Sequence, residues 1–379
     1  MRVAIALAGT DRGRSGLGTY IHALVPRLAL RLAASGGELV ALGTRADLDA
    51  YAACLANVRA SVLPSFCDGA AASAAFHLAL VGGVARRAGA SVLLLPAANR
   101  RATFDLGLPT VAVVHDLAQL HVREKYDRVR MAYLRALVRG PLRRATALVA
   151  VSRATRDDLA LALGRAPATI RIVPNGVDVA RFRPDATDRH AAELAANGFS
   201  RPYVLYVSRL ENPGKNHLRL LRAFARSTAT RGHELVFAGP DWGAHALIAA
   251  EIATLGVGDR VRVLGRVSDD LLRALTSGAD AVAMVGLREG FGLPVLEALA
   301  CGKPVLVARA GALPEVAGEL GVLCDPLDEI SMAAGLSRVL SDAAYRARVR
   351  AEGPAWAAKH DWNHTASALL DVCAAARAA

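Results

Sequence analysis

The chain has 379 residues, of which 53% are hydrophobic and 5% aromatic, so it is long enough for two domains with small aliphatic cores. Its formal net charge of +12 comes almost entirely from Arg and predicts attraction to anionic surfaces, although an Arg-rich genome composition would give the same excess. Five widely spaced cysteines without a C-x-x-C pair disfavour a disulfide or zinc framework. The sequence contains no apolar run of about 18 residues, the length that a membrane span requires. We therefore expect a soluble, cytoplasmic protein, at most peripheral to the inner face of the cytoplasmic membrane.

Short aliphatic segments alternate with longer helix-periodic stretches along the whole chain. Such alternation is typical of parallel sheets whose strands are joined by helical crossovers. The segments fall into two series, which predicts an α/β protein with two doubly wound, Rossmann-like domains. The predicted strands are 3–8, 39–43, 61–64, 92–96, 111–115, 148–152 and 170–174 in the first series, and 203–208, 234–239, 261–265, 281–285, 304–308 and 321–324 in the second.

Periodicity is lost between the two series. We therefore predict an N-terminal domain over residues 1–178, a linker over 179–200 and a C-terminal domain over 201–355. A last helical stretch over 356–379 is followed by no strand. In a two-domain α/β protein, we expect such a terminal helix to pack back across the other domain.

A glycine-containing turn follows the first predicted strand. Gly16 and Gly18 precede a helix that we expect to begin near Thr19, but Ile21 stands where a dinucleotide fingerprint would place its third glycine. The backbone of this loop could approach a sugar or a diphosphate. An ordinary tight turn between a strand and a helix explains the pattern equally well.

His115 ends a predicted buried strand, at the carboxyl edge of the first sheet. An imidazole in this place can hydrogen-bond a substrate hydroxyl or take part in proton transfer. The competing interpretation is a structural histidine whose hydrogen bonds are satisfied at the end of its strand.

Residues 124–142 combine an apolar helical stripe with surrounding arginines, among them Arg128, Arg130 and Arg135. This pattern predicts an amphipathic helix that can lie on an anionic membrane surface. A packed helix with a solvated, charged face accounts for the same pattern.

Two cations follow the first strand of the second domain. Arg209 and Lys215 precede a helix predicted over 217–226, at the carboxyl edge of the sheet, where open α/β sheets bind ligands. Together they could hold a diphosphate and stabilise the charge that develops on it as it leaves. A pair of surface cations is the alternative. No G-x-x-x-x-G-K-[ST] sequence surrounds Lys215 or Lys303, which disfavours a P-loop ATPase.

The most informative stretch lies between Glu289 and Glu297. A strand, a loop with Gly290 and Gly292, and a helix that starts with Pro follow one another, so the amides around 291–294 form a seat for a phosphate or diphosphate. Glu297, one turn into the helix, can reach this seat, and a vicinal diol best explains a carboxylate beside a phosphate. Phosphate and diol together indicate a nucleoside diphosphate sugar. Two charges that merely cap the helix would also satisfy the pattern.

Taken together, these segments resemble the family 4 glycosyltransferases of the GT-B architecture over nearly the whole chain. The resemblance is carried by residues 16–20, 115–117, 151–155 and 173–178, by Arg209 with Lys215, and by 289–294 followed by Glu297 in an E-x7-E spacing. It implies two Rossmann-like domains that face each other across a cleft, with the C-terminal helix crossing back to the N-terminal domain. It also implies sugar transfer from a nucleoside diphosphate donor with retention of anomeric configuration and without a metal.

The resemblance implies that four side chains are catalytic. Arg209 and Lys215 hold the diphosphate, Glu289 binds hydroxyls of the donor sugar, and His115 contacts the transferred sugar near the reacting carbon. The acceptor hydroxyl attacks on the face from which the diphosphate departs, and a diphosphate oxygen accepts the proton. No separate nucleophile is then required.

The other implied contacts bind the donor. The loop amides bind phosphate and sugar, Glu297 binds the ribose diol, and the nucleobase lies against residues 266–267. The first glycine loop lets the N-terminal domain close on the diphosphate. The donor-binding residues implied in this way are Gly16, Gly18, Arg209, Lys215, Arg266, Val267, Glu289, Gly290, Phe291, Gly292, Leu293 and Glu297.

Two departures from the family pattern bear on the substrate. Gly286 stands three residues before Glu289, where the family often has Ser or Thr, so one expected hydroxyl contact is in question. The loop over 211–216 is longer than the commonest form, but its Lys-Asn-His sequence is a variant of bacterial mannosyltransferase-like members. This favours transfer of mannose from GDP-mannose to a lipid-linked or polysaccharide acceptor in surface-glycan biosynthesis, such as that of O-antigen or exopolysaccharide.

Three alternatives stay open at this point. The first is a GT-B transferase with a UDP-sugar donor and a small-molecule acceptor. The second is a GT-B nucleotide-sugar epimerase, which needs no acceptor. The third is a basic nucleic-acid-binding protein, suggested by the sequence pI of about 10.1 but accompanied by no helix-turn-helix, RNP-type or zinc signature, so we expect no nucleic-acid partner.

Overall fold

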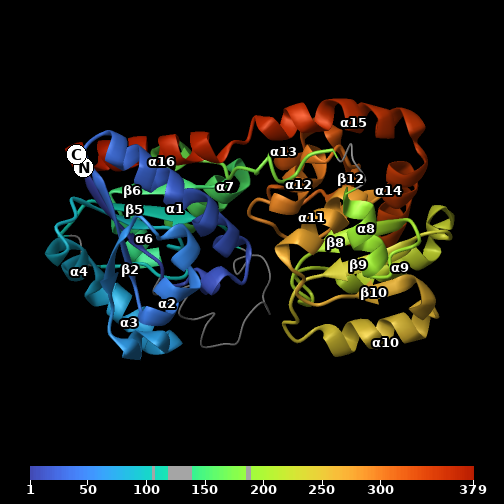
Figure 1. Ribbon diagram of the computed structural model, residues 1–379, viewed down its shortest axis with the longest axis horizontal. Coiled ribbons are helices and arrows are strands. Elements are labelled where there is room, and N and C mark those ends of the chain that lie inside the picture. Colours follow the sequence, from blue (N-terminus) through green and yellow to red (C-terminus); the bar gives the residue numbers. More distant parts are fainter. Residues whose placement is uncertain (105–106, 118–138, 185–188) are drawn as a thin grey trace. The chain divides into compact units, whose positions relative to one another are not determined.

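The computed structural model describes residues 1–104, 107–117, 139–184 and 189–379. Within them the chain forms two compact units: unit 1 comprises Met1–Gly176 and Trp362–Ala379, and unit 2 comprises Val177–Asp361. Each unit is a parallel sheet with helices on both faces (Figure 1). This confirms the predicted fold class. Among the described residues, no helix is both long enough and apolar enough to cross a bilayer.

The sheet of unit 1 has seven parallel strands in the order β3-β2-β1-β4-β5-β6-β7. They coincide with the seven predicted segments, with ends that differ by two residues at most. The central strands bury Val, Leu, Ile and Ala on both faces, as expected when helices cover both sides of a parallel sheet. The strands are β1 (Arg2–Ala6), β2 (Glu38–Gly43), β3 (Arg59–Val62), β4 (Val92–Leu95), β5 (Thr110–Val114), β6 (Ala147–Ala150) and β7 (Ile170–Ile172).

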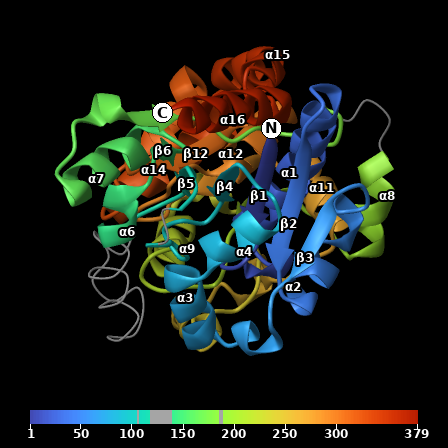
Figure 2. The same cartoon turned by 90° about the vertical axis from the view of Figure 1, so that its left-hand side faces the viewer.

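Two groups of helices cover the sheet of unit 1 (Figure 2). α1 (Gly16–Ala34) and α16 (Trp362–Ala378) pack against each other and against one face. On the other face, side chains such as Phe76, Leu142 and Leu159 share one core with the strands. They belong to α3 (Ala70–Ala79), α6 (Arg139–Arg144) and α7 (Arg153–Leu163); α2 (Arg45–Ala50) and α4 (Val81–Arg87) complete the unit.

The sheet of unit 2 has six parallel strands in the order β10-β9-β8-β11-β12-β13, and all six match predicted segments. The strand order reverses between β8 and β11, so the loops that follow these two strands meet at a topological switch point, the usual ligand site of such sheets. The strands are β8 (Tyr203–Val207), β9 (Glu234–Ala238), β10 (Val261–Val263), β11 (Ala281–Met284), β12 (Val305–Ala308) and β13 (Gly321–Cys324).

The helices of unit 2 also form two groups. α9 packs with α10 and α14, whereas α12 packs with α11, α13 and α15. The helices are α8 (Arg189–Ala196), α9 (His217–Arg226), α10 (His245–Leu255), α11 (Asp269–Gly278), α12 (Leu293–Ala300), α13 (Leu313–Ala317), α14 (Glu329–Ser341) and α15 (Ala343–Ala358).

The C-terminal stretch predicted as one helix over 356–379 is in fact interrupted. α15 ends at Ala358 and α16 begins at Trp362. The break occurs where the backbone pairs with Val177, whose N–H donates to the His360 carbonyl at 2.8 Å. After the break, α16 packs on α1 in unit 1, so the predicted return to the N-terminal domain is confirmed.

Two other limits differ from the sequence-based ones, and one further prediction lies mostly outside the described residues. Unit 1 ends its first segment at Gly176, and α8, within the predicted linker 179–200, packs on α11 in unit 2. α1 begins at Gly16 rather than near Thr19, because the Ser15 hydroxyl caps it by accepting the Leu17 N–H at 3.3 Å. Most of the basic helix predicted over 124–142 lies outside the described residues; its last four residues belong to α6.

Candidate functional site

The carboxyl edge of the unit 2 sheet carries both predicted cations and the first predicted glutamate. Lys215 Nζ donates to both carboxylate oxygens of Glu289, at 2.7 and 3.0 Å. Arg209 Nη2 donates instead to Glu211 Oε2, at 2.6 Å. The four side chains are between 9% and 18% exposed. The loop after β8 therefore holds two shielded cations, each beside a carboxylate, at the switch point of the sheet.

The backbone around Lys215 is fixed by its neighbours. The Tyr206 hydroxyl donates to the Lys215 carbonyl at 2.6 Å. Asn216 has a φ of 61°, a left-handed conformation that Asn tolerates better than most residues. Its side-chain amide donates to the carbonyls of Val285 and Pro326, at 3.0 and 2.6 Å. Asn216 thus ties the cation loop to the end of β11 and explains the Lys-Asn pair of this sequence.

Asn216→Ala should lower the free energy of unfolding by about 2 to 4 kcal/mol, because one buried and one partly buried carbonyl lose their donor and Ala is strained in the left-handed region. Urea denaturation measures the change. Asn216→Gly is the control, since Gly accepts this backbone conformation and should recover about 1 kcal/mol of the loss. Wild-type stability in Asn216→Ala would show that this residue does not anchor the loop.

The segment between β11 and α12 supplies backbone donors. Gly292 precedes α12 with a φ of 104°, and a Cβ there would lie 2.7 Å from Leu313 Cδ2. Among the residues that the structure describes, no partner accepts a hydrogen bond from the N–H groups of Phe291, Gly292 or Leu293. Pro294 has no N–H, so the phosphate-binding amides predicted around 291–294 end at Leu293. Three amides at a helix N-terminus attract an anion.

Glu297 lies one turn into α12 and is 8% exposed. Within the described part of the chain its carboxylate makes no hydrogen bond or ion pair. Burial raises the pKa of Glu297 to about 7, while Arg181 lowers it and Asp269 raises it further. A ligand that donates hydrogen bonds would stabilise the ionised carboxylate, which fits the predicted diol.

Gly286 makes room for the Glu289 carboxylate. A Cβ at this position would lie 2.7 Å from Glu289 Oε1 and 3.4 Å from the Gly214 carbonyl oxygen. A Ser or Thr would therefore compete with the carboxylate where it meets Lys215. This explains the departure from the family pattern at Gly286.

The predicted nucleobase contact lies along the same sheet edge, after β10. The Gly239 N–H donates to the Gly265 carbonyl at 2.8 Å and joins the loops that follow β9 and β10. Arg266 is exposed and Val267 is half-buried. Their contact with a nucleobase stays a prediction.

Two side chains at this edge were missed by the sequence analysis. Glu211 accepts a hydrogen bond from Arg209, and the Trp242 ring lies against the Arg209 guanidinium, whose Cζ is 4.2 Å from the ring centroid. A signal for both was present in the sequence. Glu211 stands two residues after Arg209, and Trp242 follows the end of a predicted strand at the edge where both cations lie.

In unit 1, His115 is half-buried after β5. Its Nε2 lies 2.9 Å from the Pro96 carbonyl oxygen, so the hydrogen bond assigns the proton to Nε2 and leaves Nδ1 as an acceptor. Burial lowers the pKa of His115 to about 4, and the ring is therefore neutral near pH 7. This geometry favours a hydrogen bond from a substrate hydroxyl over proton transfer.

The two glycines at the start of α1 differ in their surroundings. Gly18 is buried, and a Cβ there would lie 2.6 Å from the Gly13 carbonyl carbon, so its small size allows the turn over Asp11–Gly13 to pack on α1. Gly16 is exposed. Close packing accounts for Gly18, whereas the approach of Gly16 to a diphosphate stays a prediction. Both glycines and His115 belong to unit 1, and all other predicted site residues belong to unit 2.

Two protein-family models match consecutive parts of the chain. Residues 15–181 match the model described as Glycosyltransferase Family 4, and residues 192–356 match the model of glycosyl transferases group 1. The matches correspond to the main segment of unit 1 and to most of unit 2.

Several curated proteins are related in sequence. The D-inositol 3-phosphate glycosyltransferase of Salinispora tropica is 34% identical over 243 residues, which cover 59% of this chain and 50% of the relative. The MMP alpha-(1->4)-mannosyltransferase of Mycolicibacterium hassiacum is 31% identical over 158 residues, which cover 41% of this chain and 35% of the relative. The chain spans about half the length of the curated relatives it matches first.

Solved structures share the fold over nearly the whole chain. Anabaena HepE, solved in complex with UDP and glucose, has a TM-score of 0.77 at 19% identity and covers 99% of this chain and 100% of its own. Sucrose-phosphate synthase from Thermosynechococcus elongatus has a TM-score of 0.76 at 18% identity, with 98% of each chain covered. The solved structures share the GT-B fold of this chain, and the two family models, which together span most of its length, show that it belongs to the family 4 and group 1 glycosyltransferases.

Proposed function

We propose that the chain is a retaining, metal-independent hexosyltransferase. It moves a hexose from a nucleoside diphosphate sugar to a lipid-linked or polysaccharide acceptor in surface-glycan biosynthesis. The observation that carries the proposal is one sheet edge that combines two cations, three helix N-terminal amides and a buried carboxylate. These groups complement a diphosphate with a ribose diol beside it.

The proposed reaction uses these groups in place of a metal ion. The acceptor oxygen forms a bond to the anomeric carbon while the bond from that carbon to the diphosphate oxygen breaks, and the departing oxygen takes the acceptor proton. Arg209 and Lys215 stabilise the charge that leaves with the diphosphate. Glu289, held by Lys215, binds hydroxyls of the donor sugar. His115 Nδ1 accepts a hydrogen bond from a further sugar hydroxyl.

For the donor we propose GDP-mannose. The Lys-Asn-His sequence at residues 215–217 and the mannosyltransferase among the relatives support this choice. The second candidate is a UDP-sugar donor with a small-molecule acceptor. It is supported by the D-inositol 3-phosphate glycosyltransferases, whose name points to a polyol phosphate as acceptor.

A donor panel tests the proposal. Thermal unfolding with GDP-mannose, UDP-glucose and UDP-N-acetylglucosamine should show stabilisation by one donor, because a ligand that binds only the native state raises Tm. Product analysis by NMR should then show transfer with retained anomeric configuration. Free nucleotide with an isomerised sugar and no acceptor would identify an epimerase instead. If no donor is bound, hydrolysed or transferred, the proposed function is wrong.

We also propose peripheral contact with an anionic membrane through residues 124–142, on the basis of their sequence. Replacing Arg128, Arg130 and Arg135 by Ser removes three positive charges, each worth about 1 kcal/mol near an anionic surface. The variant should therefore be released from vesicles that contain anionic lipid in a sedimentation assay. Unchanged partitioning would rule out this contact.

A further inference from the structure

The Arg209 guanidinium contacts an aromatic ring and a carboxylate. Its Cζ lies 4.2 Å from the ring centroid of Trp242, and its Nη2 donates to Glu211 Oε2 at 2.6 Å. Trp242 is 42% exposed, whereas Glu211 is 7% exposed. A cation proposed to bind the diphosphate is thus held by one exposed and one buried neighbour.

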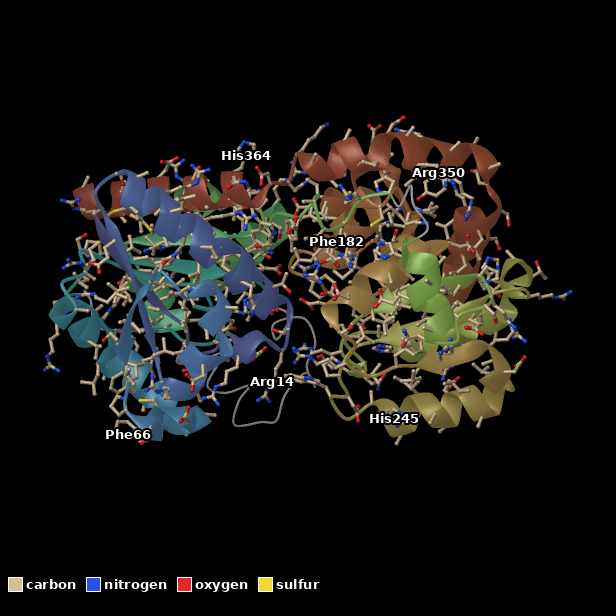
Figure 3. All side chains as sticks on the ribbon, in the orientation of Figure 1. Arg14, Phe66, Phe182, His245, Arg350 and His364 are labelled. Carbon is tan, nitrogen blue, oxygen red and sulfur yellow. The ribbon has the colours of Figure 1, made fainter. Side chains whose placement is uncertain are left out.

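Backbone contacts hold Trp242 beside Arg209. The Leu210 N–H donates to the Pro240 carbonyl and the Trp242 N–H donates to the Leu210 carbonyl, both at 2.9 Å. The Asp241 carboxylate accepts three consecutive N–H groups at 2.9 to 3.1 Å, the last from His245 (Figure 3), which begins α10. Hydrogen bonds therefore fix the loop after β9 on both sides of Trp242.

The Glu211 carboxylate occupies a space that glycine provides. A Cβ on Gly214 would lie 2.7 Å from Glu211 Oε1, so this carboxylate reaches Arg209 because residue 214 has no side chain. Glu211 is buried and ion-paired within the same loop as both cations. The position of its carboxylate is thus set by the packing of this loop.

The formal charges of this group cancel, since Arg209 and Lys215 face Glu211 and Glu289. A diphosphate that binds Arg209 has to replace Glu211 as the acceptor of the Arg209 hydrogen bond, and it then lies near the negative charge of Glu211. The repulsion grows with the charge of the ligand. The diphosphate of a nucleotide sugar carries about two negative charges, whereas a released nucleoside diphosphate carries about three, because its terminal phosphate has a second pKa near 6. The negative charge of Glu211 therefore weakens binding of the nucleoside diphosphate product more than binding of the nucleotide-sugar donor.

We propose that Glu211 is an internal counter-anion that promotes release of the nucleoside diphosphate product, and that Trp242 holds the Arg209 guanidinium while it exchanges Glu211 for the diphosphate. The inference rests on the proposed function and deepens it. Glu211 and Trp242 are positioning residues that act through Arg209, because neither has to touch the reacting carbon.

Calorimetric titration of the full chain tests the counter-anion. The ligands are inorganic pyrophosphate, GDP and GDP-mannose, or the UDP pair if the donor panel selects it. Glu211→Gln keeps the shape of the side chain and removes its charge. It should bind pyrophosphate and GDP about tenfold more tightly, with a smaller gain for GDP-mannose. Slower product release should lower kcat and KM together.

Glu251→Gln is the matched control, because Glu251 accepts a hydrogen bond from Arg222 at 2.7 Å in the same unit and away from the sheet edge. Its affinities should equal those of the wild type. An unchanged or weaker affinity of Glu211→Gln for GDP, or an equal gain for GDP and GDP-mannose, would overturn the proposal. If the wild type binds no nucleotide, that result would instead contradict the proposed function, and this inference would fall with it.

Two substitutions test Trp242. Trp242→Phe keeps an aromatic face for the guanidinium and should bind pyrophosphate within about twofold of the wild type. Trp242→Ala removes that face and should bind about tenfold more weakly. Wild-type affinity in Trp242→Ala would overturn the role of the tryptophan, and so would an equal loss in both variants.

Discussion

Replacing Lys215 by Ala should lower kcat by about 100-fold or more. Negative charge accumulates on the diphosphate oxygen as its bond to the sugar breaks, and a shielded cation stabilises that charge more in the transition state than in the bound donor. Lys215 also donates to both oxygens of Glu289, at 2.7 and 3.0 Å. Its loss therefore frees the carboxylate that is proposed to orient the donor sugar.

Initial rates at saturating donor measure this effect, and two further variants interpret it. Glu289→Gln removes the carboxylate charge while Lys215 stays, and a smaller loss of kcat there would separate the two roles. Arg222→Ala breaks ion pairs with Glu251 on α10 and Glu329 on α14, neither of which is a predicted site residue. Because Arg222 is 41% exposed, we expect wild-type kcat and a stability change of about 1 kcal/mol or less. Intact turnover in Lys215→Ala would refute its assigned role.

Donor affinity should increase as the pH rises from about 6 to 8, through Glu297. The pKa of this buried carboxyl is raised to about 7, so it is largely protonated at pH 6. A ribose diol donates hydrogen bonds best to the ionised carboxylate, and binding below pH 7 must therefore release a proton. Titrations of a nucleotide sugar in buffers of different ionisation enthalpy measure that proton. Nucleotide sugars are the right ligands because their diphosphate does not titrate in this range.

Glu297→Gln and a 2′-deoxyribose form of the same nucleotide sugar are the controls. Each should bind more weakly at pH 8 than the wild-type pair and should show little dependence on pH. A wild-type affinity that is flat across this range would contradict the diol contact. So would a pH dependence that persists in Glu297→Gln.

The same carboxyl should make the ligand-free protein less stable at high pH. A carboxyl whose pKa is raised on folding binds more protons in the native state, so its contribution is present below about pH 4.5 and is lost as the pH rises through about 7. At pH 8 Glu297→Gln should therefore be more stable than the wild type, by up to about 3 kcal/mol, and this gain should shrink toward pH 5. Denaturant unfolding at both pH values measures the difference.

The fold could be predicted largely from the sequence, because aliphatic strands that are buried on both faces stand out from the helices between them. The interruption between α15 and α16 could not. It depends on pairing with Val177, a residue far away in the chain, while the local sequence favours a continuous helix. The limits of α1 were similarly set by the Ser15 cap rather than by the pattern of apolar residues.

The candidate site was only partly predictable. Spacing and strand ends placed Lys215 and Glu289 at one sheet edge, but their direct contact joins residues 74 positions apart and depends on the loop conformation that Asn216 sets. Glu211 stands close to Arg209 in the sequence, but their contact depends on the space left by Gly214, which becomes visible only in the folded loop. In unit 1, glycine patterning suggested a ligand contact where the structure shows close backbone packing at Gly18.

Hydrogen exchange of the full chain, measured by mass spectrometry with and without saturating nucleoside diphosphate, tests most directly whether the unit 2 sheet edge is the donor site. We predict slower exchange at the Phe291, Gly292 and Leu293 amides and in the loop over 208–216, with unchanged exchange in the middle of α10. A bound nucleotide that leaves exchange in both segments unchanged, or that protects only other parts of the chain, would contradict this assignment.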